Sequence, residues 1–289
     1  MIKNIAVFAT FNYSNIYIIK ALEDAGFNVS VMTRDITSAK GILPPNVNLV
    51  EGNLRYHHDL KFFLDTQDAV YCSFDTGAQD ENDYQEETDG LREIINASLE
   101  SGIRRIALHS SIIQKYQGEN GFYWWAFKVK NEAVNYVRDC GIPFTILSTS
   151  SFMESLMNGH LKNKTIQIFG EAKFPIYYIS VVDFGKMLVN SFSKLGTDDR
   201  EYNIQGENCY TPIEAATIFV RNYNVEKLKI KTFTMACVKF KGIFNKRMNY
   251  NSNLMSAINN YGEIFCGEQA WKELGKPEID LIKYANSLS

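Results

Sequence analysis

Polar side chains fill the turn between the first apolar run of the chain and the first amphipathic segment. Residues 5–8 form an apolar run of strand length, and Ile18, Ile19 and Leu22 follow at helical spacing before Gly26. In a parallel α/β layout, the N-terminus of the first helix is where a dinucleotide pyrophosphate would bind, because its free N–H groups and dipole favour anions. The sequence therefore predicts a nucleotide-type turn, but the glycines that usually build such a turn are missing.

Arg34 ends the second predicted strand, close to where NAD-binding sheets place an acid for the ribose hydroxyls. Thr33 stands at the acidic position, and the planar guanidinium of Arg34 suits a 2′-phosphate. If a dinucleotide binds, this pattern favours NADP(H) over NAD. The alternative is an exposed arginine that pairs with Asp35 or Glu23.

Hydroxyl and imidazole groups end two further predicted strands. Ser73 lies near the end of the fourth strand, beside the expected cofactor path, and His109, Ser110 and Ser111 close the fifth. A serine there can hydrogen-bond a substrate carbonyl, and a histidine can serve as an acid or base near neutral pH. Capping of the strand ends is the alternative role. No Gly-x-Ser-x-Gly sequence surrounds these residues, so a hydrolase is not indicated.

The elements that must position these groups alternate between helix and strand. Three predicted helices end in a small residue followed by Gly26, Gly102 or Gly141, and an apolar strand begins at once. Glycine at such a place accepts the left-handed conformation that closes a helix. Short continuous apolar runs are typical of parallel strands buried on both faces. The alternation predicts an α/β fold with a doubly wound parallel sheet of the Rossmann type.

The second half of the chain is less regular and predicts a smaller C-terminal α/β lobe. Thr211 as N-cap and Pro212 at the first helical position predict a helix start there. We expect a dinucleotide-binding-type domain over residues 1–152 and a substrate-side lobe over 153–289, with 179–205 returning to the first sheet. Strands are expected at 165–169, 177–179 and 201–204, and helices at 182–193 and 212–222.

Composition and charge are those of an ordinary globular chain: of 289 residues, 45% are hydrophobic and 22% charged, and the net charge is -3. This charge makes no general case for nucleic acid. No window approaches the roughly 18 apolar residues of a membrane span, and the N-terminus lacks a signal-peptide core. Five widely spaced cysteines without a CxxC pair favour reduced, mostly buried thiols and hence a cytoplasmic protein. The four histidines show no metal-ligand spacing.

In this order of segments, the chain resembles the NmrA-like group of atypical short-chain dehydrogenase/reductases over nearly its whole length. Lys128 and Glu132 also match, on a predicted helix between residues 102–111 and 141–147. The resemblance implies a Rossmann fold that binds NAD(P)(H), in a family of NADPH-dependent reductases and cofactor-sensing regulators. The matching stretches are VFAT (7–10), VMTR (31–34), VEGNL (50–54), GIRRIALHSS (102–111), GIPFTIL (141–147), SFMESL (151–156) and ISVVD (179–183).

The resemblance places Ala9, Asn12 and Asn15 at the three positions of the family's Gly-x-x-Gly-x-x-Gly turn. Ala9 adds only one methyl group. Asparagine is the best non-glycine residue for a left-handed turn, so Asn12 is expected to keep the backbone shape with its side chain directed towards the pyrophosphate. Asn15 must find room between helix and strand or shift the helix outward. The alternative is a structural turn that asparagine side chains close and that binds no cofactor.

Other cofactor contacts follow from the same resemblance. Asn53 stands where the family usually has an aspartate near the adenine, and an amide can both donate and accept hydrogen bonds. The resemblance thus implies a set of cofactor-binding residues beside the turn positions: Phe11, Tyr13, Ser14, Arg34, Asn53, Leu54, Ser73, Lys128 and Ser151.

Lys128 corresponds to the lysine of the dehydrogenase Tyr-x-x-x-Lys pair, but Trp124 stands where the tyrosine would be. Tryptophan cannot donate the proton, because its indole N–H is not a usable acid. Lys128 is expected to hold the ribose or polarise a carbonyl, with Ser110 and His109 as further catalytic candidates. The alternative is a surface lysine paired with Glu132.

Aromatic side chains would line the cleft if the family layout holds. Such a lining suits a flat apolar ligand, for example a quinone or polycyclic compound. Packing in the core is the alternative use of these side chains. The residues expected to bind substrate are Tyr123, Trp124, Phe152, Met153 and Tyr178.

Two charged runs bear on partners. Residues 227–247 carry seven Lys/Arg and no acid, whereas 75–89 carry seven acids and no base. The basic run could dock a partner, and opposite charges would permit a homodimer, although such runs are more often solvated faces.

The leading hypothesis is an NADPH-dependent reductase of a small carbonyl, quinone or conjugated substrate. A non-catalytic sensor or interaction protein with a weakened cofactor site is the alternative.

Overall fold

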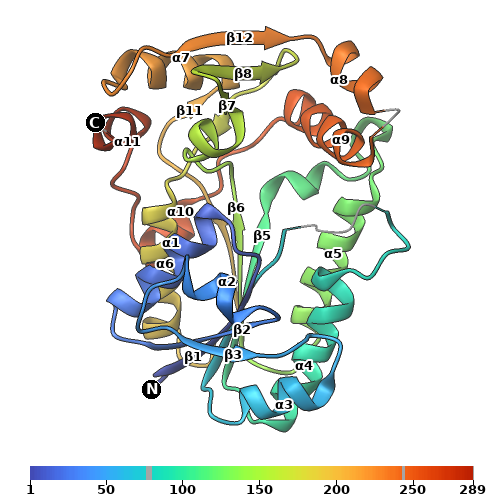
Figure 1. The fold of residues 1–289 in the computed structure, drawn as a ribbon, viewed down its shortest axis with the longest axis vertical. Coiled ribbons are helices and arrows are strands. Elements are labelled where there is room, and N and C mark those ends of the chain that lie inside the picture. Colours follow the sequence, from blue (N-terminus) through green and yellow to red (C-terminus); the bar gives the residue numbers. More distant parts are fainter. Residues whose placement is uncertain (76–79, 243–244, 289) are drawn as a thin grey trace.

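Seven parallel strands form the central sheet of the protein, seen in a computed structural model that describes residues 1–75, 80–242 and 245–288 (Figure 1). The strand order is β10-β6-β5-β4-β1-β2-β3. The chain therefore winds outward from β1 in both directions, and the order reverses between β1 and β4. Ligands bind at the carboxyl side of such a reversal in open α/β sheets. The strands are β1 (Asn4–Ala9), β2 (Asn28–Thr33), β3 (Asn48–Glu51), β4 (Ala69–Ser73), β5 (Arg105–Ser111), β6 (Phe144–Thr149) and β10 (Arg200–Ile204).

Helices cover both faces of this sheet, because successive side chains of each strand point to opposite sides. In β1, Ile5 and Val7 pack with α1, α6 and α10, whereas Ala6 and Phe8 pack with α3, α4 and α5. The predicted doubly wound parallel sheet is confirmed. The helices around it are α1 (Tyr13–Asp24), α2 (Ile36–Lys40), α3 (His57–Leu64), α4 (Leu91–Glu100), α5 (Trp125–Arg138), α6 (Val181–Lys194) and α10 (Glu268–Leu274).

The remaining elements gather above the carboxyl edge of the sheet (Figure 1). Thr211 and Glu214 form a reciprocal capping box at the start of α7, as the Thr-Pro signal predicts. The small sheet of this region has the order β12-β8-β7, and β9 pairs antiparallel with β11. Its elements are β7 (Leu161–Lys162), β8 (Thr165–Phe169), β9 (Ile176–Tyr177), β11 (Cys209–Tyr210), β12 (Lys229–Phe233), α7 (Pro212–Asn222), α8 (Met235–Gly242), α9 (Lys246–Asn260) and α11 (Leu281–Ser287).

Short helical turns complete the chain. One π-helical turn precedes α4, and two 3₁₀ turns lead from β5 towards α5. A second π-helical turn precedes β7. These turns are η1 (Glu86–Gly90), η2 (Ile112–Tyr116), η3 (Glu119–Gly121) and η4 (Leu156–His160).

All five cysteines are free thiols, but the expectation that most are buried was wrong. Cys72 and Cys140 are buried, Cys209 is half-buried, and Cys237 and Cys266 are exposed. The last three lie in the lobe above the sheet. Among the residues that the structure describes, no helix is long and apolar enough to cross a bilayer.

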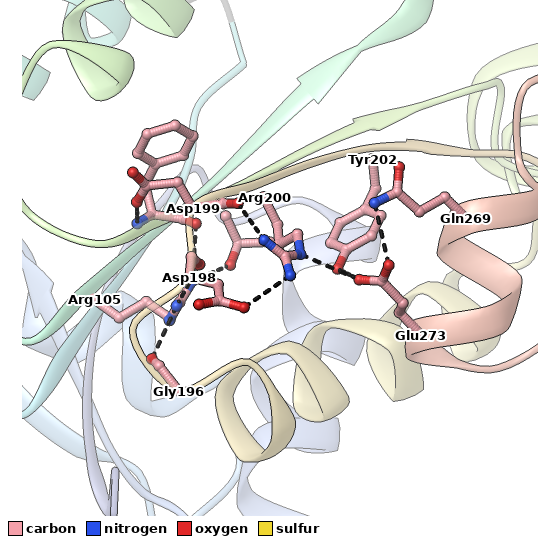
Figure 2. A network of polar contacts seen from close by, with 10 residues as sticks. Arg105, Gly196, Asp198, Asp199, Arg200, Tyr202, Gln269 and Glu273 are labelled. Atoms are coloured by element: carbon pink, nitrogen blue, oxygen red, sulfur yellow. Dashed lines mark hydrogen bonds and ion pairs between the residues drawn. The ribbon is translucent and has the colours of Figure 1, made fainter.

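Arg105, at the start of β5, is fully buried and ties the turn before β10 to the sheet (Figure 2). One guanidinium nitrogen donates to Phe144 O at 2.8 Å and to Thr145 Oγ1 at 2.7 Å. The other donates to Gly196 O at 2.9 Å and Asp198 O at 2.8 Å. All four acceptors are neutral, so the fork geometry of the guanidinium matters as much as its charge.

The same corner also positions α10. Arg200 pairs with Asp198 at 2.8 Å and donates through Nε to Glu273 Oε2 at 3.3 Å, and the hydroxyl of Tyr202 donates to the same oxygen at 2.5 Å (Figure 2). Glu273 belongs to α10. The edge strand β10 is thus fixed from the core side by Arg105 and from the surface side by α10.

We predict that Arg105→Met lowers the free energy of unfolding by about 3 to 5 kcal/mol, because the buried acceptors on Phe144 and Thr145 lose their donor and the two bonds to the turn before β10 are also lost. Chemical denaturation followed by circular dichroism measures the change. Arg221→Met, on an exposed position of α7, is the matched control and should shift stability by less than about 0.5 kcal/mol. Equal losses in the two variants would contradict the structural role given to Arg105.

Candidate functional site

A cleft of about 980 Å³ lies between the carboxyl edge of the sheet and the overlying lobe. Its floor comes from the ends of β5 and β6 and includes Ser111, Ser151 and Phe152. Its roof is largely apolar and comes from β8, β12 and α9, with Phe169, Phe233, Met248, Leu254, Met255 and Ile258. Tyr13, the first residue of α1, also lines it. The cleft therefore reaches the turn after β1, and its mixed lining suits a ligand with both apolar and polar groups.

The turn after β1 is closed by asparagine side chains, the arrangement that the alternative interpretation predicted. Asn12 caps α1, because its Oδ1 accepts from the Asn15 amide at 2.8 Å and from Ser14 Oγ at 2.7 Å. The prediction of a left-handed Asn12 was wrong: its φ is −111° and ψ 173°, the extended conformation of an N-cap. Asn15 finds room, since its Nδ2 donates to Thr10 O at 2.9 Å and Ser73 O at 3.2 Å.

Asp75 adds a carboxylate to this turn. Asn12 Nδ2 donates to Asp75 Oδ2 at 2.7 Å, and the amide of Asp75 donates to Thr10 Oγ1 at 3.1 Å. A negative charge near a helix N-terminus is favourable for the helix. The Asp75 carboxylate would also repel any other anion at this helix end. The Asn12–Asp75 contact occupies part of the space where a pyrophosphate would bind.

Tyr13 and Glu154 lie together beneath the cleft. The pKa of Tyr13 is raised by burial and by the carboxylates of Glu154 and Asp75. Glu154 is buried: its Oε1 accepts from the Val181 amide at 3.0 Å, and its Oε2 has no hydrogen-bond partner among the described residues. Burial, with a smaller contribution from Asp183, raises the pKa of Glu154 to about 7. Glu154 is therefore protonated below neutral pH.

The residues predicted for the adenosine end lie at the ends of β2 and β3. Arg34 is 74% exposed, and its nearest acid is Glu86 at 3.8 Å, rather than Asp35 or Glu23. Asn53 is used locally, because its Oδ1 accepts from the Arg55 amide at 3.1 Å. Leu54 is half-buried beside it. The Arg34 guanidinium is thus accessible to an anion, whereas the side-chain oxygen of Asn53 already accepts a hydrogen bond.

His109 links three strands instead of facing the cleft. Its Nδ1 lies 2.9 Å from Ser73 Oγ and its Nε2 3.0 Å from Thr149 Oγ1. Burial, reinforced by nearby Lys130, lowers the pKa of His109 to about 3. The imidazole therefore stays neutral at physiological pH, which disfavours the predicted acid–base role. Ser110 is also buried and donates to Gln114 Oε1 at 3.0 Å.

Lys128 does not point into the fold. Its side chain is 70% exposed and its Nζ lies 3.8 Å from Glu132 Oε1, as the surface alternative predicted. Lys130, two residues later on α5, is only 19% exposed, pairs with buried Glu87 and lines a small cavity with His109. Burial lowers the pKa of Lys130, but the Glu87 carboxylate outweighs this effect and the net pKa is raised. The lysine of α5 that points into the protein is therefore Lys130. The four-residue spacing from Trp124 did not indicate this position.

Of the five residues expected to bind substrate, only Phe152 lines the large cleft. Tyr123 is 76% exposed. Trp124, just before α5, is buried. The centroid of its ring lies 4.6 Å from that of the Tyr250 ring on α9, which covers it. Met153 and Tyr178 are buried in the core of the lobe and border a separate, smaller pocket beside residues 276–283. The other predicted cofactor residues lie near the turn: Ala9 and Phe11 pack on the core, and Ser151 lines the cleft.

Sequence reasoning missed Asp75, Lys130, Glu154 and Glu263. Asp75 begins an acidic run, and Lys130 lies off the four-residue spacing from Trp124, so no spacing singled them out. Glu154 stands within the SFMESL stretch, where a buried acid between apolar residues was the available signal. Glu263, which lines the cleft, follows α9 in a stretch with no recognisable pattern.

The two charged runs meet within the chain. Lys246 Nζ lies 3.5 Å from Asp80 Oδ2, which joins the start of α9 to the acidic run. Residues 76–79 and the side chains of residues 241–244 of these runs lie outside the described part of the structure. The expectation of a homodimer or protein partner stays a prediction.

A parallel sheet that reverses between β1 and β4, with a cleft at its carboxyl edge, defines an α/β protein of the Rossmann type. The chain belongs to the NmrA-like family, whose model matches residues 1–277. The resemblance seen in the sequence is thereby confirmed.

Solved structures of this fold cover nearly all of the chain. An NADPH-dependent quinone oxidoreductase from Escherichia coli is 14% identical, with a TM-score of 0.74 over 98% of this chain and 99% of its own. A triphenylmethane reductase from Citrobacter sp., complexed with NADP(H), is 13% identical, with a TM-score of 0.72 over 98% and 99%. A UDP-glucose 4-epimerase from Thermotoga maritima is 15% identical, with a TM-score of 0.70 over 98% and 96%. At these identities the likeness shows the fold alone.

We predict that Glu154 makes stability fall with rising pH. Its carboxyl is deprotonated near pH 4.5 in the unfolded chain but only near 7 in the fold. Stability is therefore fully present below the lower value and is lost as pH rises through the upper one. Between about pH 5 and pH 8 the free energy of unfolding should fall by on the order of 2 kcal/mol more in the native protein than in Glu154→Gln. Urea denaturation at several pH values measures this.

Glu171→Gln, at an exposed position, is the control for this effect and should follow the native pH dependence. If Glu154→Gln also follows the native curve, Glu154 titrates normally and its burial has no such consequence.

Proposed function

We propose that this protein binds NADP(H) along the carboxyl edge of its sheet and reduces a small carbonyl, quinone or related conjugated compound in the cleft. The observation that carries the proposal is the continuity of the two sites. Tyr13 belongs to the first turn of α1, where a pyrophosphate would bind, and also lines the 980 Å³ cleft. A dinucleotide on α1 would thus extend towards the ligand cleft. The fold and the family support the same assignment.

The chain's own residues fit the dinucleotide with one adjustment. Arg34 is exposed at the end of β2 and suits a 2′-phosphate. The first N–H groups of α1 have no acceptor within the helix and favour phosphate. At the pyrophosphate, the Asn12 amide must exchange the Asp75 carboxylate for a phosphate oxygen. Asn12 remains a donor in that exchange, so the turn keeps a means of holding an anion.

The protein's contribution to a reduction lies in binding and in water exclusion. A bound nicotinamide supplies the hydride. The apolar roof formed by Phe169, Phe233 and Met255 favours a flat conjugated ligand. Ser111 and Ser151 on the floor offer hydroxyl groups to its polar atoms.

A non-catalytic sensor on the same fold is the second candidate, and the Asn12–Asp75 contact favours it. A carboxylate beside the pyrophosphate position weakens the binding of any dinucleotide. His109 stays neutral and Lys128 is exposed, so neither residue offers acid–base chemistry at the cleft. The two candidates differ in their affinity for NADPH.

Titration of the purified protein with NADPH and NADH, followed by cofactor fluorescence, tests the proposal. We expect micromolar NADPH binding that weakens at least about tenfold in Arg34→Ala, because a bidentate charge-assisted contact is lost. NADH binding should be unaffected by this substitution. Arg221→Ala, at an exposed position of α7, is the charge-matched control. Absence of binding at millimolar cofactor would refute the proposal and favour the sensor.

We further predict that Asp75→Ala tightens NADPH binding by roughly five- to tenfold, because it removes a like charge and releases the Asn12 amide. Calorimetry at low salt gives the affinities. The gain should shrink at high salt, where surface charges are screened. Asp139→Ala removes a charge after α5, at the opposite edge of the sheet, and should leave the affinity unchanged. A loss of affinity in Asp75→Ala would contradict the competition described above.

A further inference from the structure

Glu263 stands in the loop between α9 and α10 and is the only carboxylic acid among the described residues that line the large cleft. Two strand ends hold its side chain. Ser150 Oγ, just after β6, donates to Glu263 Oε2 at 2.8 Å. Gln205 Nε2, just after β10, donates to Glu263 Oε1 at 2.7 Å. The carboxyl group is thus fixed at the carboxyl edge of the central sheet, where this fold places ligands.

Gln205 also fixes the loop that carries Glu263. This glutamine is fully buried. Its Oε1 accepts from the Cys266 amide at 2.7 Å, and its Nε2 also donates to Ile264 O at 3.0 Å. Its backbone carbonyl accepts from Trp271 Nε1 at 3.0 Å. The chain that follows Glu263 is therefore bound to Gln205 at three points, and the carboxyl group is preorganised before any ligand arrives.

The surroundings of Glu263 favour its protonated form. Burial raises the pKa of Glu263 to about 6, although Gln205, Ser150, the Tyr177 amide and Lys115 act in the opposite direction. Glu263 therefore carries its proton at mildly acidic pH and loses it readily near neutrality.

Other titratable groups near Glu263 are weaker candidates for proton transfer. Burial, Glu263, Glu119 and Cys266 raise the pKa of Tyr261 to about 12. Burial and Glu263 also raise the pKa values of Tyr177 and Tyr178. At Tyr177, Cys209 contributes to the rise as well. At the lobe side of the cleft, burial lowers the pKa of His160, whose Nδ1 lies 2.8 Å from Gln167 O. The tyrosines hold their protons too tightly, and the histidine is neutral.

We propose that Glu263 is the proton donor of the cleft and that its protonated carboxyl hydrogen-bonds an oxygen of a bound carbonyl or quinone ligand. This inference rests on the proposed function for the reductive step. When a hydride from the reduced nicotinamide, which is thereby oxidised, adds to the ligand, the electron pair of its C=O bond moves to oxygen. The carboxyl O–H bond of Glu263 then breaks as a new O–H bond forms on the ligand. Water returns a proton to the carboxylate.

The first test measures protonation without any cofactor. Infrared difference spectra between the native protein and Glu263→Gln should show a protonated carboxyl at about pH 5 that disappears with a midpoint near 6. Glu171→Gln, at an exposed position, is the control, and its difference spectrum should lack the band that Glu263→Gln removes. A Glu263 carboxyl that is already ionised at pH 5 would overturn the proposal.

The second test uses menadione, a small quinone, as the probe, with binding followed by tryptophan fluorescence. Affinity should be at least about tenfold weaker at pH 8 than at pH 5, because one ionisation removes the donor. Glu263→Gln should bind equally at both pH values, since an amide still donates and can still satisfy Ser150 and Gln205. Glu263→Ala should bind weakly at both. Failure of menadione to bind, or a native pH dependence in Glu263→Gln, would overturn the proposal.

The two proposals fail separately. If NADPH does not bind but menadione binding depends on Glu263 and pH, the reductase proposal fails and Glu263 remains a ligand-binding donor. If NADPH binds and menadione is reduced with the same pH profile by the native protein and by Glu263→Gln, the reductase proposal stands and the role of Glu263 is wrong.

Discussion

The position of the edge strand β10 depends on a buried guanidinium. Arg105 donates on one side to the start of β6 and on the other to the turn that leads into β10. A lysine could not serve both sides, because its single ammonium lacks the planar fork of donors. With β10 held beside β6, Gln205 emerges at the carboxyl edge and binds the loop that carries Glu263. A contact near the amino edge of the sheet thus supports the strand whose other end binds the loop that carries Glu263.

The first turn shows how a fold persists while a binding site changes. Glycines in such a turn leave space for phosphates, whereas here Asn12 Oδ1 accepts from the Asn15 amide and Asn15 Nδ2 donates to Thr10 O. The helix gains an N-cap, and the ends of β1 and β4 gain a side-chain bridge. Asp75 completes this arrangement with a charge that a pyrophosphate would have to displace. Helix capping and any anion at this turn would therefore compete for the Asn15 N–H group of α1.

The acid–base groups are distributed differently from what the resemblance implies. His109 lies within β5 and Lys130 lies on α5 beside it; burial leaves the first neutral, and Glu87 pairs with the second. Both support the sheet from below the cleft. Glu263 instead reaches the cleft from the loop after α9, a part of the chain more than 100 residues away from its partner Ser150. Chemistry at this edge would therefore draw on the lobe as much as on the sheet.

The sequence by itself determined the fold class and most elements of the central sheet. Continuous apolar strands, glycine after each helix and the capping signals at Thr211 and Pro212 act locally, so each can be recognised within a few residues. It also placed Arg34 at a strand end and asparagines in the first turn, because a strand end and the turn after it are adjacent in the chain; their binding roles stay predictions.

Only the tertiary structure decided which of these groups face the cleft. Lys128 and Lys130 are two residues apart, and their orientation depends on how α5 packs against η1 and the sheet. Trp124 is buried because α9, more than 100 residues later, covers it. Asp75 and Glu263 acquire their surroundings from strands distant in sequence, and burial sets the pKa of Glu263. Packing across such separations leaves no periodic pattern in the sequence. The sequence therefore indicated the sheet edge where a site is expected, but not which side chains meet there.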